Sequence, residues 1–225
     1  MTNTEHISAH ADPENETPWA MQFVVHDTKD FTPLQLANAV ATATSLFLTT
    51  IPNNYARGEA VQRWMEGRIR KILRRAKNST WKNLESLSHE TYTVEGVTIR
   101  VFDPSSMDAI PREISKCQVS HLTTLPEQTA SVGPEDAMLR IYTNRSLNMS
   151  PAKAAVAAGH IAQLMGLELS LADYEKWQAD GFRVRTSTLG SISDFEAGAS
   201  SVSVYDAGFT EVEPGSITAV GIWTK

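Results

Sequence analysis

One segment near the C-terminus, Val204–Ile222 (VYDAGFTEVEPGSITAVGI), carries polar side chains in a pattern that can support chemistry. A predicted strand delivers Asp206 to a turn of two small residues, Ala207 and Gly208, and Thr210 follows. This arrangement places a carboxylate and a hydroxyl at a strand edge, where small residues leave room for a ligand. Ordinary turn chemistry is the alternative explanation, because Asp and Gly favour turns.

A second segment, Met149–Gln163 (MSPAKAAVAAGHIAQ), predicts an Ala-rich helix that begins at Ser150-Pro151. Lys153 lies in its first turn, and His160 lies seven residues later on the same face. The helix dipole disfavours a cation there unless an anion binds beside it, and free backbone N–H groups at that end attract a phosphate or an oxyanion. A solvated lysine and a packed histidine are the alternative, because Ala-rich helices usually indicate close packing.

A third segment is strongly basic within an acidic protein. The formal net charge of −6 argues against a nucleic-acid binder, yet eight of the twenty basic residues lie between Arg63 and Lys82. The candidate RNA-binding residues are Arg68, Arg70, Lys71, Arg74 and Arg75. Apolar spacing in Ala60–Lys77 predicts a helix, with a strand over part of it as the second interpretation. The basic residues would otherwise be only the wet face of an amphipathic helix.

The elements that must position these segments follow one plan twice. In the first half we predict a strand, a capped helix and a strand: Met21–Asp27, Thr32 to about Leu48, and Val97–Asp103, which ends at a Pro-Ser-Ser turn. In the second half we predict a strand, a capped helix and three strands: Met138–Tyr142, Ser150 to a stop at Gly166, Phe182–Thr186, Val202–Asp206 and Ser216–Trp223. The chain then divides into a polar tail (1–19), a first domain (20–120), a linker (121–137) and a second domain (138–225).

The repeat can be tested by counting positions. The block VFDPSSMDAIPREIS lies over VYDAGFTEVEPGSIT without a gap, so Asp103 meets Asp206. The helix starts at Pro33 and Pro151 match as well. Two matched blocks in the same order favour a duplicated α/β domain. One continuous α/β domain with two similar hairpins is the alternative.

Composition limits the class of protein. Apolar residues make up 41% of the 225 positions, enough for a packed core, and no stretch approaches the roughly 20 apolar residues needed to cross a bilayer. The single cysteine, Cys117, excludes an intrachain disulfide, and no Cys/His cluster has metal-ligand spacing. The N-terminus is polar and does not have the pattern of a signal peptide. We therefore expect a cytoplasmic protein with no membrane segment, metal or cofactor.

The segments around the helix start and the Asp turn resemble the archaeal–eukaryotic type of peptidyl-tRNA hydrolase. That family carries Gly-Lys at a helix start, then Ala-Ala-Gln and a His; near its C-terminus it carries Asp-Ala-Gly-Arg-Thr-Gln, Pro-Gly-Ser, a Thr and a closing apolar strand. Ala152-Lys153 takes the Gly-Lys place, and His160 has the family's spacing. The positions that fit the second motif without a gap are Asp206, Ala207, Gly208, Thr210, Pro214, Gly215, Ser216 and Thr218. Trp177 and Gly181, followed by FRVRT, resemble the family's Trp…Gly…Lys-Val strand.

The chain also departs from that family's pattern. In the second half the family's Gln, Arg and second Gln fall on Ala157, Phe209 and Glu211. The last two changes remove a cation and add an anion, so both should weaken contact with RNA phosphates. The first half has lost more of the motif, because the corresponding positions there are Gln35, Thr42, Asp103-Pro104-Ser105 and Met107. We interpret that half as structural.

The resemblance implies hydrolysis of the ester that joins a peptide to the 3′-terminal ribose of tRNA. Asp206 would orient or deprotonate the water, Lys153 would stabilise negative charge or hold the terminal phosphate, and Thr210 would hydrogen-bond the water or the ribose. The supporting residues would be His160, Ser216 and Thr218. Family members form homodimers of a mixed four-stranded sheet flanked by helices. Two fused halves would therefore form a pseudo-dimer in one chain, which can act as a monomer on tRNA or peptidyl-tRNA.

Two other functions stay open at this point. One is a catalytically degenerate protein of the same fold that binds RNA or another ligand, which the lost Gln and Arg and the acidic balance favour. The other is a plain interaction domain in which the Asp turn is structural.

Overall fold

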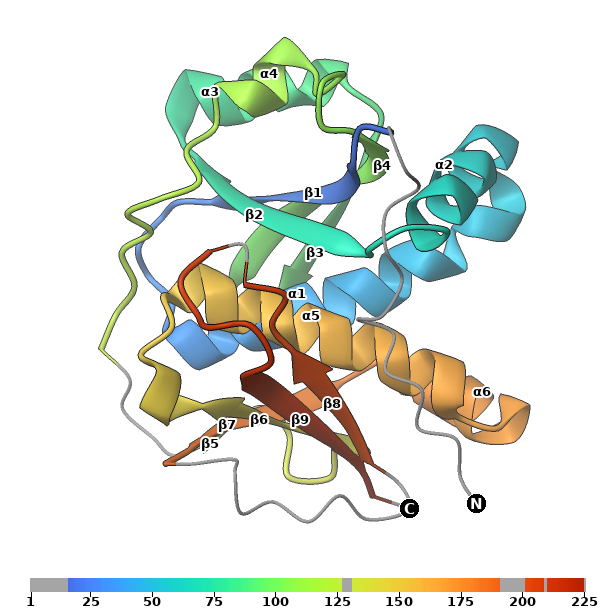
Figure 1. Ribbon diagram of the computed structural model, residues 1–225, viewed down its shortest axis with the longest axis vertical. Helices are drawn as coiled ribbons and strands as arrows, with labels where there is room; N and C mark the ends of the chain where they lie inside the picture. The colour runs from blue at the N-terminus through green and yellow to red at the C-terminus, as the bar shows by residue number, and fades with distance from the viewer. Residues whose placement is uncertain (1–15, 127–130, 191–200, 209, 225) are drawn as a thin grey trace.

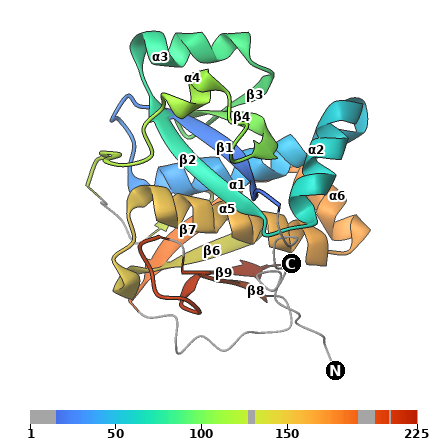
Figure 2. The ribbon, with the colours of Figure 1, turned by 45° about the horizontal axis from the view of Figure 1, so that its top comes forward.

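The fold is described from a computed structural model that covers residues 16–126, 131–190, 201–208 and 210–224. Figure 1 shows two mixed β-sheets with two long helices between them, α1 (Pro33–Thr49) and α5 (Pro151–Glu168). Figure 2 shows from a second direction that α1 and α5 lie side by side. The described residues therefore form an α/β protein whose centre is a pair of packed helices.

The two sheets share the order and directions of four strands, and the second has one more strand, β5, at its edge. The first contains β1 (Trp19–His26), β2 (Arg70–Ala76), β3 (His89–Val94) and β4 (Val97–Ser106), in the order β2-β1-β4-β3. The second contains β5 (Ser131–Val132), β6 (Leu139–Asn144), β7 (Val184–Leu189), β8 (Ser201–Tyr205) and β9 (Ile217–Trp223), in the order β5-β7-β6-β9-β8. In each sheet the first two long strands in sequence pair in parallel and the other pairs are antiparallel. Strands β1, β2, β3 and β4 thus correspond to β6, β7, β8 and β9.

Smaller elements complete the described part of the chain. The shorter α-helices are α2 (Tyr55–Met65), α3 (Asn78–Asn83), α4 (Arg112–Ser115) and α6 (Leu171–Ala179). The 3-10 turns are η2 (Ile51–Asn53), η3 (Leu84–Ser86) and η4 (Arg145–Leu147). Helices α3 and α4 cover the outer face of the first sheet, opposite the face that α1 and α5 cover (Figure 1).

Both long helices begin where capping chemistry predicts. The Thr32 hydroxyl accepts from the Gln35 backbone N–H, and the Gln35 side chain accepts in return from the Thr32 N–H. The Ser150 hydroxyl likewise accepts from the Lys153 N–H at the start of α5. A proline follows each cap, where its missing N–H costs nothing. The two predicted helix starts are confirmed.

A shared contact also relates the two halves. The Trp64 indole N–H donates to the backbone oxygen of Arg70 at 2.8 Å, and the Trp177 indole N–H donates to that of Arg183 at 3.0 Å. Each tryptophan lies on the short helix before a parallel strand, six residues ahead of its acceptor. Both contacts fix the turn from helix into strand, so β2 and β7 enter their sheets in the same way.

One buried apolar cluster joins α1, α5 and the inner faces of both sheets. The closeness of the two helices depends on Gly159, since a Cβ there would lie 3.0 Å from both the Thr44 hydroxyl and a Val40 methyl. On its other side α5 packs against β9, where a Cβ on Gly221 would overlap with the Ile161 side chain. Small residues therefore set the position of the helix that carries Lys153 and His160.

One helical stretch, Pro33–Asn53, is apolar and long enough to cross a membrane by length and composition, contrary to the expectation from the sequence. It runs through the centre of the fold, and 67% of its most apolar window is buried inside the protein. Its apolar side chains therefore belong to the core between the two sheets.

The predicted helix over Ala60–Lys77 is wrong beyond Met65. Helix α2 ends there, and β2 begins at Arg70 and pairs in parallel with the buried strand β1. Lys71 and Leu73 alternate toward the interior, so part of the apolar spacing is that of a strand. The alternative of a wet helix face is also wrong for this part of the segment.

Two other predicted element ends are corrected. Gly166 does not stop α5, which continues to Glu168; a Cβ there would make ordinary contact with the Tyr174 ring, at 3.4 Å. Strand β4 does not end at Asp103 but passes through Pro104 to Ser106. Pro104 is tolerated because it lies where the register of β4 on β1 shifts, between the pairs Ala20–Ser105 and Gln22–Phe102.

The predicted equivalence of Asp103 and Asp206 is wrong. Asp103 lies inside β4, whereas Asp206 follows β8, and β8 corresponds to β3. The residue that follows β3 is Glu95, which therefore occupies the place of Asp206 in the first half. Asp103 instead forms an ion pair of 2.6 Å with buried Arg57. The matching letters reflect similar strand composition, not equivalent positions.

Two glycines test the packing with matched substitutions. Gly221→Ala should lower the free energy of unfolding by about 1–3 kcal/mol, because the new methyl overlaps with Ile161. Gly58→Ala should raise it by about 0.5–1 kcal/mol, because Gly58 lies in α2 and its Cβ would find ordinary contact, 3.5 Å from Ile51. Urea unfolding of the two variants checks both signs; equal effects would show that β9 and α5 are not closely packed.

Candidate functional site

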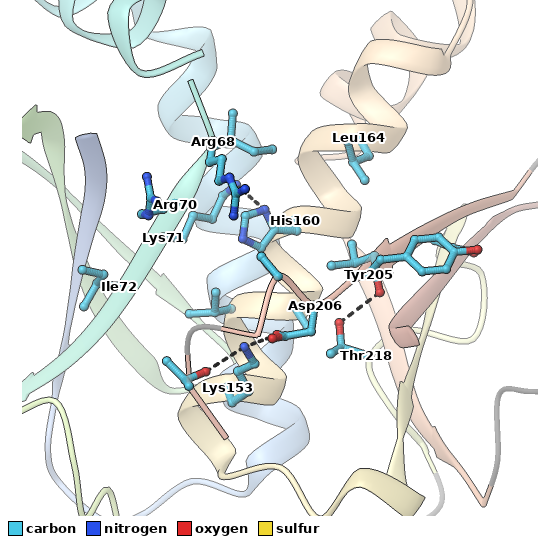
Figure 3. A pocket seen from close by; sticks show the side chains of 17 residues that line it. Arg68, Arg70, Lys71, Ile72, Lys153, His160, Leu164, Tyr205, Asp206 and Thr218 are labelled. Atoms are coloured by element: carbon cyan, nitrogen blue, oxygen red, sulfur yellow. Dashed lines mark hydrogen bonds and ion pairs between the residues drawn. The ribbon is translucent and has the colours of Figure 1, made fainter. Parts of the chain in front are cut away.

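A cavity of about 290 Å³ lies between strand β2 of the first sheet and the α5–β8 region of the second (Figure 3). Its walls include Val156 and Leu164 from α5, Ile72 from β2, and Tyr205 at the end of β8. These side chains make most of the lining apolar. Polar groups enter it from β2 in the first half and from α5, β8, β9 and the loop between these two strands in the second, so the cavity is built by both halves of the chain.

Lys153, Asp206 and Thr210 all line this cavity, and Figure 3 shows Lys153 beside Asp206. The Lys153 ammonium pairs with the Asp206 carboxylate and donates to the Thr210 hydroxyl at 2.9 Å. The Asp206 side chain is 6% exposed and that of Lys153 is 18% exposed, so water has limited access to the pair. The structure thus brings together the three candidate catalytic residues, from a helix start, a strand end and the following loop.

The turn after β8 holds the Asp206 carboxylate in place. Its Oδ1 accepts from the Gly208 backbone N–H at 2.7 Å, while Oδ2 faces Lys153. The Asp206 backbone also bonds to the Ser216 oxygen at 2.9 Å and to the Gly215 N–H at 2.8 Å. Gly208 has a φ of +78°, and a Cβ there would overlap with Pro214, so only glycine suits this position. Backbone hydrogen bonds therefore join the Asp-Ala-Gly segment to the Pro-Gly segment.

The helix geometry alone suggests that the start of α5 is open to an external anion. In the structure an acidic side chain of the protein itself is bound there. The Glu211 carboxylate accepts from the Ser150 backbone N–H at 2.7 Å and from the Ser150 hydroxyl at 2.6 Å. An acidic side chain at a helix N-terminus is stabilised by the dipole. Glu211, which replaces a glutamine of the resembled motif, thus serves as an internal anion at this helix end.

His160 does not join the Lys153 cluster but contacts Lys71 on the opposite wall. The Lys71 amine lies 3.2 Å from His160 Nδ1 (Figure 3). It also donates to the Gln163 side-chain oxygen. Burial lowers the pKa of Lys71 well below its ordinary value. Burial, and then the charges of Lys71 and Lys153, lower the pKa of His160 well below its ordinary value. His160 is therefore neutral at physiological pH.

Thr218 and Ser216 contribute to the site mainly by holding its strands and turn in place. The buried Thr218 hydroxyl donates to the Val204 oxygen at 3.2 Å and thereby ties β9 to β8 beneath the cavity. Ser216 accepts from the Asp206 N–H through its backbone oxygen. Both support the turn that carries Asp206.

The five candidate RNA-binding residues divide into three groups. Arg68 and Arg70 line the cavity, on the wall opposite Asp206. Lys71 also lines it but is only 7% exposed, so it is an interior residue. Arg74 donates to the Gln22 side chain and the Cys117 oxygen, and Arg75 pairs with Asp27 at 2.7 Å. Those last two arginines are engaged within the first half and lie outside the cavity lining.

The corresponding place in the first half is closed. The Asn38 amide donates to both Glu95 carboxylate oxygens, at 3.0 and 3.1 Å, and to the Val132 backbone oxygen at 3.1 Å. A Cβ on Gly133 would lie within 3.0 Å of that same amide, so β5 and the following residue pack directly on the cluster. Gln35, in the place of Lys153, donates to the Glu95 backbone oxygen at 3.4 Å. Segment 131–133 thus fills the space that is a cavity in the second half.

Sequence reasoning missed two features of this site. Gln163 was not among the candidates, and the apolar walls come from residues that are far apart in sequence. Only the i, i+3 spacing of His160 and Gln163 on one helix face indicated their proximity. Phe209, the expected loss of a cation, lies outside the described residues.

No family model matches the chain. Within the described ranges, no group of three or more His, Cys, Asp or Glu side chains is placed to hold a metal ion.

Lys71→Met should stabilise the protein at neutral pH. Because the pKa of Lys71 is lowered in the folded state, protonation favours the unfolded chain at every pH below the ordinary lysine value. Removing the amine should raise the free energy of unfolding by on the order of 1 kcal/mol or more, since one pKa unit corresponds to about 1.4 kcal/mol. Urea unfolding at pH 7 and pH 10 measures this, and the gain should shrink at pH 10. A variant less stable than wild type at pH 7 would contradict the assignment of Lys71 as a strained interior amine.

Proposed function

We propose that this chain hydrolyses the ester between a peptide and the 3′-terminal ribose of tRNA, as a tandem pair of domains resembling the archaeal–eukaryotic peptidyl-tRNA hydrolases. The observation that supports the proposal most is the convergence of Lys153, Asp206 and Thr210 at a cavity, since these residues fit the resembled motif. The matching order and directions of the two sheets support the duplication. A tRNA substrate also fits a cytoplasmic location.

The proposed reaction needs an activated water and stabilisation of an oxyanion. Asp206 accepts the proton of a water that attacks the ester carbonyl carbon, a contribution of about 10²–10⁴-fold. Lys153, already aligned between Asp206 and Thr210, stabilises the negative charge on the former carbonyl oxygen, a contribution of about 10²–10³-fold. The C–O bond to the ribose then breaks, and the ribose oxygen takes the proton from Asp206. Thr210 holds the water or the ribose by a hydrogen bond.

The wall that faces these residues would bind the nucleic acid. Arg68 and Arg70 come from the first half and line the same cavity as Asp206. Guanidinium groups suit phosphate oxygens because they offer several donors in one plane. The apolar walls would accept the ribose and the terminal base. The substrate would therefore span both halves, and the first half supplies more than structure in this proposal.

Binding without turnover is the second candidate. Ala157 places a small apolar residue in the cavity wall where the resembled motif has a glutamine, and Glu211 occupies the start of α5. Both observations reduce the polar groups available for catalysis. An RNA-binding protein with an inactive site would keep the cavity and its arginines but leave the ester intact.

Hydrolysis of an N-blocked aminoacyl-tRNA tests the enzyme. Lys153→Ala and Asp206→Asn should each lower kcat/KM by about 10²–10⁴-fold, and the double variant should lose little more, because both groups act on one transition state. The matched controls are Gln35→Ala and Glu95→Gln, at the equivalent places of the closed half, and they should retain activity. A wild-type protein as inert as the two site variants would leave binding without turnover in its place.

Salt dependence of tRNA binding tests the basic wall. Arg68→Gln and Arg70→Gln should weaken tRNA binding and flatten its salt dependence, by a slope of roughly 0.7–0.9 for each phosphate group that the variant no longer binds. Arg112→Gln is the control, because Arg112 is exposed on α4 at the outer face of the first sheet. Equal affinities and slopes for all three variants would show that RNA does not use this cavity.

A further inference from the structure

Lys71 is a polar residue in a place where the fold does not need one. In the first sheet Met21 pairs with Lys71, and in the second Leu139 pairs with Val184, at the same distance after Trp64 and Trp177. Lys71 therefore corresponds to a buried valine. The residue types at this place differ although the surrounding strands, helices and tryptophan contacts are alike.

The side chains that Lys71 contacts also differ in type from those at the equivalent positions of the first half. Counting from the helix starts at Pro33 and Pro151, His160 corresponds to Thr42 and Gln163 to Ser45. The three polar side chains that contact one another in the cavity half are thus matched by a valine, a threonine and a serine. The cluster accompanies the open cavity and is missing where segment 131–133 fills the equivalent space.

The contacts of Lys71 define what its amine can do. Its partners are the Gln163 oxygen, His160 Nδ1, and the Trp64 ring, whose centroid lies 4.9 Å from the amine. Among the described residues no carboxylate forms an ion pair with it. An amine has two hydrogens and an ammonium has three, so after the bond to Gln163 at least one hydrogen remains for His160 in either state.

A donor at Nδ1 fixes the tautomer of the imidazole. If Nδ1 accepts from Lys71, the ring proton of neutral His160 must lie on Nε2. Within the described part of the chain Nε2 has no hydrogen-bond partner, and His160 lines the cavity. An Nε2–H group is then available to an oxygen of a bound ligand.

We propose that Lys71 is a positioning residue that keeps the proton of neutral His160 on Nε2 and so makes the imidazole a second hydrogen-bond donor of the cavity. The site is in this sense composite, since a strand of the first half sets the state of a side chain on a helix of the second. The use of that donor on an ester oxyanion rests on the proposed function. The tautomer of His160 does not depend on the proposed function.

Charged and titratable groups reach the cavity from each element around His160. They are Arg68, Arg70 and Lys71 from the β2 side, Lys153 from α5 itself, and Tyr205 and Asp206 from the end of β8. Lys71 is the one that contacts the imidazole directly among the described residues. Removing the Lys71 amine should therefore change the tautomer and the pKa of His160 more than removing another charge from the cavity would.

Imidazole nitrogen NMR on the full chain tests the proposal. The six histidines are distinguished by the loss of one signal set in His160→Gln. Wild type should show His160 with its proton on Nε2 and a pKa well below the ordinary range. Lys71→Met should raise the pKa of His160, because a neighbouring cation is lost, and should give a mixture of tautomers. Leu73→Met, a buried change on the same strand, is the control and should leave both observables unchanged.

Hydrolysis in the same variants separates this proposal from the proposed function. On N-blocked aminoacyl-tRNA, Lys71→Met should lower kcat about 10-fold or more with little change in KM, as loss of one oriented donor does. If wild type does not hydrolyse the ester, the proposed function fails while the NMR result still decides the state of His160. His160 protonated on Nδ1 in wild type, or unchanged in both Lys71→Met and Lys71→Gln, would overturn the proposal.

Discussion

The close contact between α1 and α5 is the constraint on which the rest of the structure depends. Each long helix packs against the other helix and against strands of both sheets, so the inner face of each sheet is covered by both helices together. Gly159 permits that approach, and Gly221 permits β9 to approach α5 from the opposite side. A helix held on two sides has little freedom to move. Lys153 in its first turn and His160 two turns later are therefore fixed relative to both sheets.

This constraint explains why the cavity has walls of two kinds. Helix α5 lies at the junction of the halves, so its outer surface faces β2 of one sheet and the end of β8 of the other. The wall from β2 carries guanidinium and amine groups, and the turn after β8 carries a carboxylate. The first half, in which the resembled motif is absent, still contributes three basic side chains to the lining, those of Arg68, Arg70 and Lys71. Its own equivalent place is filled by segment 131–133, which packs on Asn38 and Glu95.

The features that could be predicted from the sequence are those determined by interactions between residues close together in the chain. The two helix starts follow from Thr32-Pro33 and Ser150-Pro151, because capping involves neighbours within three residues. The approach of Lys153 and Asp206 was expected only through the resemblance to a known motif, since the ion pair joins elements far apart in the chain. Spacing alone left ordinary turn and packing explanations open. Local sequence patterns therefore predicted helices and strands, but not which of them come into contact.

The errors have physical causes of the same kind. The segment around Lys71 and Leu73 has apolar residues that fit both a helix and a strand, and pairing with β1 decides between them. The burial of Lys71 is set by α5, about 90 residues away, so a basic stretch gave no sign of it. Asp103 and Asp206 share their neighbours' letters but not their place in the sheet. Strand order makes Glu95 the equivalent of Asp206 in the first half. It is a property of the fold and cannot be found by counting positions along the chain.

The filled space in the first half has a consequence for stoichiometry and for the effects of substitutions. A symmetric dimer of identical subunits repeats every substitution at two places, so a change that improves one site also alters its twin. In this chain the two places are encoded separately, and segment 131–133 closes one of them. The protein therefore presents a single cavity of this kind per chain among the residues described, and a ligand of that cavity should bind in a ratio of one to one. Residues on either side of α5 are free to diverge independently.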